Sequence, residues 1–143
     1  KYPNNEYPIL SAQARSEVMA TVLDHTIVPV KDREKSVEFY TRIFGFDDLG
    51  AVGPFLAVKV NDTLNFDFRE SEDFRSIHYA FAMDSQEFEE AFARIQESGI
   101  PYGDSPRAQD NMKGPGMTTG AKGMGKAVYF KDPDGHVLEI KTY

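Results

Sequence analysis

The stretch YFKDPDGHVLEI, residues 129–140, decides the fold of this chain. Its Asp-Gly pair is typical of a tight hairpin turn, because glycine adopts positive φ without strain. In the strand that follows, alternation places Leu138 and Ile140 on one face and Glu139 with Lys141 on the other. The apolar face suits packing against helices, whereas a carboxylate on the opposite face must be solvated, paired or bound to a metal ion. We therefore expect antiparallel strands here, with Glu139 on a concave face.

Two short apolar stretches, rich in β-branched or aromatic residues, are each interrupted by one histidine, His25 in the first and His78 in the second. A helix pattern follows each stretch and ends at a glycine, Gly45 in the first case and Gly99 in the second. His25 precedes Gly45 by 20 residues (45 − 25), and His78 precedes Gly99 by 21 (99 − 78). The chain therefore looks duplicated, with the two histidines at equivalent positions.

The residue pattern predicts the same element order in both copies. Each begins with a strand and an aspartate-capped helix, and three further strands follow. The expected strands are residues 22–30, 47–51, 55–60 and 64–69 in the first copy, and about 77–83, 107–109, 126–131 and 136–143 in the second. This predicts an α+β fold of two βαβββ modules, about 21–70 and 76–143, within a single domain, 21–143. We treat residues 1–20 as an N-terminal extension, with a short helix around 12–20.

His25, His78 and Glu139 together form a possible metal site. Pseudo-symmetry of the two copies would bring their first strands close together and let the three side chains converge. Two neutral imidazoles and one carboxylate bind a divalent transition metal while leaving positions open for substrate or water. Each histidine alone also fits a core imidazole that is hydrogen-bonded to backbone. His136 lies three positions from Glu139, on the opposite face of the strand, and we predict a turn or packing role for it.

Further residues are candidates for lining the same cavity. Alternation puts Asn65 and Asp67 on the strand face opposite to three apolar side chains. The stretch 103–125 holds six glycines and is too long for an ordinary connection. It is either a lid over the cavity or a surface loop without a chemical role. As a lid, it would carry Arg107 toward an anionic group of a substrate.

Composition limits the function classes. The chain has 143 residues, a net charge of −7 and no cysteine. The acidic balance, with no basic cluster, argues against nucleic acid as a partner, and no apolar run is long enough to span a membrane. Without cysteine, a metal would have to be held by His, Asp, Glu or neutral oxygen donors. We expect a cytoplasmic protein, and leave a removed N-terminal signal open because the first residue is Lys1.

These motifs resemble the vicinal oxygen chelate superfamily, which includes glyoxalase I, extradiol dioxygenases, fosfomycin-resistance thiol transferases, methylmalonyl-CoA epimerase and bleomycin-binding proteins. The resemblance covers about residues 22–143. Its most specific parts, in order along the chain, are LDHTIVPV (23–30), FYTRIFGF (39–46), HYAF (78–81) and YFKDPDGHVLE (129–139).

The resemblance implies that the two modules form a cupped mixed β-sheet with a divalent metal ion (Fe, Zn, Mn, Ni or Co) in the cup, and that the protein is a homodimer. His25, His78 and Glu139 match the ligand positions of the family. Glyoxalase I has a further acidic ligand where this chain has Asn65 or Asp67, which weakens that assignment. The implied function is a metal-dependent enzyme acting on a small oxygen-rich molecule by lyase, isomerase or dioxygenase chemistry. The alternative is a metal-free small-molecule binding or resistance protein of the bleomycin-binding type.

Overall fold

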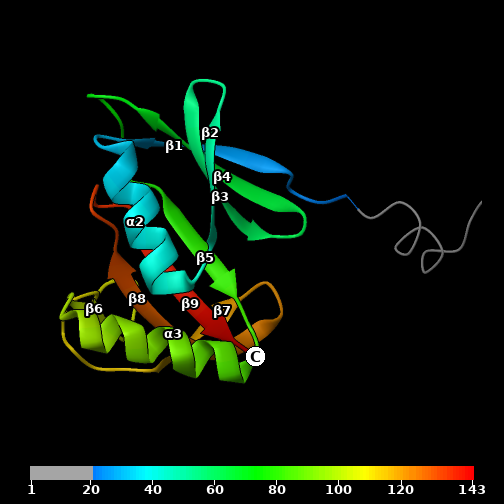
Figure 1. Ribbon diagram of the computed structural model, residues 1–143. Coiled ribbons are helices and arrows are strands. Elements are labelled where there is room, and N and C mark those ends of the chain that lie inside the picture. The colour runs from blue at the N-terminus through cyan, green and yellow to red at the C-terminus, as the bar shows by residue number, and fades with distance from the viewer. Residues whose placement is uncertain (1–20) are drawn as a thin grey trace, which may run out of the picture.

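The computed structural model describes residues 21–143, which form two sheets and two helices in an α+β arrangement (Figure 1). The expected extension at 1–20, including its short helix, lies outside the described residues. The first module contains β1 (His25–Val30), α2 (Arg33–Phe44), β2 (Asp47–Val52), β3 (Phe55–Asn61) and β4 (Leu64–Glu70). The second contains β5 (His78–Ala82), α3 (Ser85–Ser98), β6 (Tyr102–Gly103), β7 (Gly116–Gly120), β8 (Gly123–Lys131) and β9 (Val137–Thr142). Neither helix is long and apolar enough to cross a membrane.

The two sheets repeat one topology, which confirms the predicted fold class. In the first sheet the strand order is β1-β4-β3-β2, with β1 parallel to β4 and the other pairs antiparallel. In the second sheet the order is β5-β9-β8-β6, with β5 parallel to β9 and β7 paired with β8. In each module the first strand thus lies beside the last one. This pairing places His25 of β1 beside β4, which carries Asn65 and Asp67. It places His78 of β5 beside β9, which carries Glu139.

The predicted helix ends are those that the structure shows. The Asp32 carboxylate accepts a hydrogen bond from the backbone N–H of Lys35 at 3.1 Å, and α2 ends at Gly45 with φ of 74°. The Asp84 carboxylate caps α3 in the same way at 2.8 Å, and α3 ends at Gly99 with φ of 75°. Both glycines occupy the left-handed region, which side chains with a Cβ rarely adopt.

A single hydrophobic core lies between the modules. In Figure 1, α2 lies at the left of the view and α3 runs along the bottom, beside the second sheet. α2 packs on β3 and β4, α3 packs on β9, and the two helices touch. Aromatic rings join the two halves: the ring centroids of Phe44 and Phe81 are 4.7 Å apart, and those of Phe66 and Phe81 are 5.6 Å apart. Because the apolar faces are turned toward this core, the opposite face of each sheet is available for a site.

One segment differs from the prediction. Residues 107–109 are not a strand, and only an isolated bridge between Ser105 and Ala108 lies there. Much of the expected loop at 103–125 is instead a hairpin of β7 and the start of β8. Its glycine content suggested a flexible loop, but a Cβ at Gly116 would overlap the backbone of Asp104. Glycine serves close packing at this position rather than chain flexibility.

Candidate metal centre

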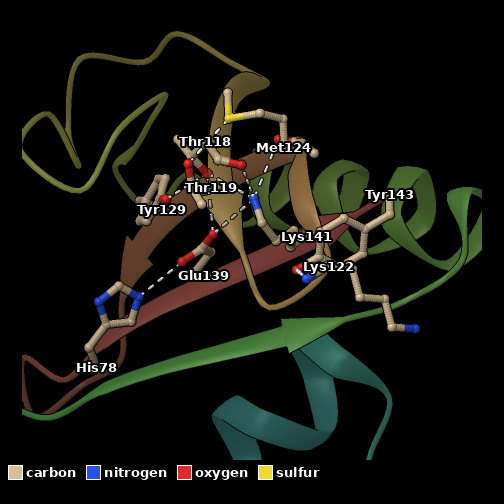
Figure 2. A network of polar contacts seen from close by, with 10 residues as sticks. His78, Thr118, Thr119, Lys122, Met124, Tyr129, Glu139, Lys141 and Tyr143 are labelled. Carbon is tan, nitrogen blue, oxygen red and sulfur yellow. Dashed lines mark hydrogen bonds and ion pairs between the residues drawn. The ribbon is translucent and has the colours of Figure 1, made fainter.

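His78 and Glu139 meet on the outer face of the second sheet. His78 begins β5, Glu139 lies in the middle of the parallel neighbour β9, and Glu139 is paired in register with Ala80. The imidazole Nε2 of His78 lies 3.1 Å from Oε2 of Glu139 (Figure 2). The Glu139 side chain is 7% exposed and that of His78 is 45% exposed. The pair is therefore held from below by the sheet and is open to solvent at the imidazole.

The second oxygen of Glu139 belongs to a polar network that connects three strands. Glu139 Oε1 lies 3.4 Å from the Thr118 hydroxyl of β7 and 3.5 Å from the Lys141 ammonium on its own strand. Lys141 Nζ donates to the carbonyl oxygen of Thr118 at 2.7 Å and to its hydroxyl at 2.9 Å. The network leaves Oε2 directed at His78, as Figure 2 shows. Glu139 is therefore fixed in orientation before any ligand binds.

The Thr118 hydroxyl uses its full bonding capacity in this network. It accepts from the Tyr129 hydroxyl at 2.9 Å and from Lys141 Nζ at 2.9 Å, and it lies 3.4 Å from Glu139 Oε1. With two acceptor sites occupied, its single proton is directed to the carboxylate. Burial raises the pKa of the Tyr129 hydroxyl, so this phenol remains protonated near neutral pH and donates to Thr118.

His25 lies on the first sheet, away from this pair. Its side chain is 58% exposed, and its Nδ1 lies 2.7 Å from Oδ2 of Asp24. That hydrogen bond raises the pKa of His25, with smaller contributions from the charges of Asp24 and Asp67. Within residues 21–143, no three His, Cys, Asp or Glu side chains are grouped so that they could hold a metal ion. The chain thus brings together two of the three predicted ligands.

The predicted cavity-lining residues fall in two different places. Asn65 is paired in register with His25 on β1, and Asp67 is paired with Ile27, two residues further along the same strands. Both therefore accompany His25 rather than the His78–Glu139 pair. Arg107 lines a separate cavity of about 710 Å³, together with Phe39, Arg42, Lys131, Asp132 and other residues.

Sequence reasoning missed Thr118 and Tyr129 as members of the site. For Lys141, the third member of the network, the sequence did carry a signal, because alternation on the last strand placed it on the same face as Glu139. Tyr129 is paired in register with Glu139 across β8 and β9. Thr118 was hidden because its segment was interpreted as a loop, which removed any reason to compare its register with that of β9.

The His78–Glu139 pair fits two neighbouring positions in the coordination sphere of one metal ion. Ligands at roughly 2.0–2.2 Å from an ion stand about 3–3.5 Å apart. The observed 3.1 Å between Nε2 and Oε2 meets this condition, and nitrogen and carboxylate donors suit divalent first-row metals. The residues present therefore fit a metal centre that one further ligand would complete.

A comparison of the sequence with family models agrees with the fold. The model described as Glyoxalase/Bleomycin resistance protein/Dioxygenase superfamily matches residues 22–140. The chain belongs to this superfamily. The match spans both modules of the chain and confirms the resemblance that its motifs indicated.

Relatives of this superfamily member carry different activities in their names. It is 26% identical over 134 residues to Metallothiol transferase FosB of Lysinibacillus sphaericus, an alignment that covers 84% of this chain and 81% of that protein. Among solved structures, it is similar to Oxidase ChaP-H1, with a TM-score of 0.75, 37% identity and coverage of 87% of this chain and 97% of that one. Oxidase ChaP-H2 gives a TM-score of 0.76 at 32% identity, covering 87% and 95%. These relatives are enzymes by name, in agreement with the expectation of an enzyme.

Proposed function

We propose that this protein is a metal-dependent enzyme that acts on a small oxygen-rich molecule, with His25, His78 and Glu139 as its metal ligands. The observation that carries the proposal is the 3.1 Å approach of His78 Nε2 to Glu139 Oε2 on an open sheet face. The name of the relative FosB, a metallothiol transferase, supports metal dependence. The names of the ChaP relatives support redox chemistry on the same fold.

We propose further that His25 reaches the site from a second copy of the chain, in a homodimer. Within one chain, His25 and the His78–Glu139 pair lie on separate sheets. His25 already has the hydrogen bond that orients metal-binding histidines, because its Nδ1 faces the Asp24 carboxylate and leaves Nε2 as the ligand atom. Its exposure suits a surface that another subunit covers. Asn65 and Asp67, beside His25, would enter the same shared cavity.

The chemistry follows from the donor set. A divalent ion held by two imidazoles and a carboxylate keeps open positions and acts as a Lewis acid toward oxygens of a substrate. Fe, Zn, Mn, Ni and Co all accept these ligands, and lyase, isomerase, transferase and dioxygenase reactions are compatible with them. The chain itself contributes a carboxylate that is fixed in orientation and an imidazole, that of His78, that is open to solvent.

Metal analysis tests the proposal. We expect protein purified without added metal, or reconstituted with Zn²⁺, Mn²⁺, Co²⁺, Ni²⁺ or Fe²⁺ and then desalted, to retain about one ion per chain, as the proposed site count requires. His78→Ala and Glu139→Gln should each lose this ion. Glu97→Gln, which makes the same chemical change at an exposed position of α3, is the matched control. Absence of bound metal under all conditions, or full retention in Glu139→Gln, would exclude the proposal and leave the metal-free binding function.

A further inference from the structure

Lys141 is a buried cation beside the proposed metal site. Its side chain is 4% exposed although it lies on the outer face of the sheet. Its ammonium donates to the carbonyl oxygen and hydroxyl of Thr118 at 2.7 and 2.9 Å, and lies 3.4 Å from the carbonyl oxygen of Gly125. Burial of an ammonium is costly unless it is both hydrogen-bonded and paired with an anion.

The fold provides a fitted slot for this side chain. A Cβ at Gly120 would lie 2.5 Å from Cε and 2.8 Å from Cδ of Lys141, so a side chain there would displace the lysine stem. The ring of Tyr143 covers the slot, with its centroid 5.6 Å from Nζ. At Gly125, a Cβ would lie 2.5 Å from the carbonyl oxygen of Thr142. The hairpin and the end of β9 thus enclose the lysine from several sides.

Glu139 is the anion that this cation meets. Nζ lies 3.5 Å from Oε1 of Glu139, and the hydroxyl of Thr118 stands between them as a shared partner. Neutral oxygens alone would not repay the cost of burying the charge, whereas the carboxylate balances it. The hydroxyl donates to Oε1, and the ammonium balances the charge of the carboxylate from 3.5 Å. The remaining oxygen, Oε2, is the one that faces His78.

We infer that Lys141 is a positioning residue that holds Oε1 of Glu139 and thereby presents Oε2 to the metal ion. This inference rests on the proposed metal site and adds to it a group that touches neither metal nor substrate. Partners of this kind, which orient a ligand from behind, typically account for 10- to 100-fold in metal affinity. Lys141 also ties β7 and β8 to β9, so the hairpin that was expected to be a loop becomes part of the site.

Cobalt titration of the full chain tests the inference, because the visible spectrum of Co²⁺ reports both affinity and coordination. We expect Lys141→Met to bind Co²⁺ on the order of 10- to 100-fold more weakly than the parent and to show an altered spectrum. Lys126→Met, at an exposed position of β8, should match the parent. Lys141→Arg should recover part of the affinity, because it restores the cation opposite Glu139; a lysine that only braced the hairpin would not change the spectrum.

The outcomes separate this inference from the proposed function. Failure of the parent to bind any Co²⁺ would overturn both. Equal affinity and an unchanged spectrum in Lys141→Met, with normal binding by the parent and by Lys126→Met, would overturn the inference alone. If Lys141→Met does not fold, Lys141→Gln takes its place, since it removes the charge opposite Glu139 and keeps a hydrogen-bond donor for Thr118. A several-fold loss of affinity is then expected, and no loss would contradict the inference.

Discussion

Nε2 of His136 lies 2.7 Å from the carbonyl oxygen of Pro29, which joins the last strand region of the second module to the first strand of the first. The other ring nitrogen, Nδ1, accepts from the backbone N–H of Ile77 at 3.0 Å. Because an N–H can only donate, Nδ1 carries no proton, and the ring is the tautomer with its proton on Nε2. Both ring nitrogens are thereby satisfied in a fully buried side chain.

We therefore expect His136→Ala to lower the free energy of unfolding by about 3 kcal/mol, from two lost hydrogen bonds and a cavity in the core. Urea unfolding at neutral pH measures this change. His25→Ala is the matched control, because the exposed His25–Asp24 pair should contribute little to stability. Similar stabilities for the two variants would contradict a joining role for His136.

The carboxyl of Asp132 provides a test by pH. It is buried and accepts hydrogen bonds from the Tyr40 hydroxyl at 2.8 Å and from the backbone N–H of Asp134 and of His136 at 2.9 Å each. Burial raises its pKa above the ordinary value of 3.8, although these hydrogen bonds act in the opposite direction. The folded protein therefore binds this proton more tightly than the unfolded chain does.

The sign of the pH dependence follows from that difference. A raised folded-state pKa contributes stability that is fully present below the unfolded pKa and is lost as pH rises through the folded one. We expect the stability of the parent relative to Asp132→Asn to fall as pH rises from about 3.8, by about 1.4 kcal/mol for each unit of pKa elevation. Asparagine keeps the size and the acceptor oxygen, so the variant should fold.

Urea unfolding from pH 3.5 to 7 compares the two proteins, with Asp62→Asn, at an exposed hairpin turn, as the control for loss of a surface charge. A stability difference that stays constant would show that hydrogen bonds to Asp132 balance the effect of burial on its pKa. A difference that moves in favour of the parent as pH rises would show that they outweigh it.

Gly120 allows a test of the lysine slot without removal of the lysine. A methyl group there would collide with the stem of Lys141 and the hydroxyl of Tyr143. We expect Gly120→Ala to cost about 1–3 kcal/mol of stability, as overpacking does. We also expect it to weaken metal binding by moving the ammonium away from Glu139. Thr119→Ala, at the exposed neighbouring position of the same hairpin, should change neither property. Parent-like stability and affinity in Gly120→Ala would show that the slot has spare room.

The sequence was sufficient to predict parts of the molecule that depend on local chemistry. Caps at Asp32 and Asp84 and the stops at Gly45 and Gly99 follow from side chains within a few residues. The position of Glu139 on the outer face followed from period-two alternation. The β7 strand did not, because GMTTG has a loop composition and its glycines are required by contacts with residues far along the chain.

The placement of His25 shows the same limit for the site. Equivalence of the two copies correctly gave each histidine the same position in its module, at the start of β1 and of β5. This equivalence did not determine how the two modules pack, because their packing depends on which face of each sheet covers the aromatic core. With those faces turned inward, His25 and His78 lie on separate sheets, and the proposed site would take His25 from a second chain.

A mixture of two inactive variants tests this arrangement directly. His25→Ala retains His78 and Glu139, whereas His78→Ala retains His25, so neither forms a complete site with itself. In a dimer of one chain of each kind, His78 and Glu139 of the first meet His25 of the second. One of the two sites is then intact and the other lacks both histidines.

We expect co-expressed chains with two different affinity tags, purified for dimers that carry both, to recover about half of the parent metal content, as one intact site in two requires. Each variant alone should bind little metal, and a mixed dimer of Glu139→Gln with His78→Ala should also bind little, because both lesions fall in the same half-site of their own chain. If all three ligands came from one chain, the mixed His25→Ala and His78→Ala dimer would bind no more metal than its parts.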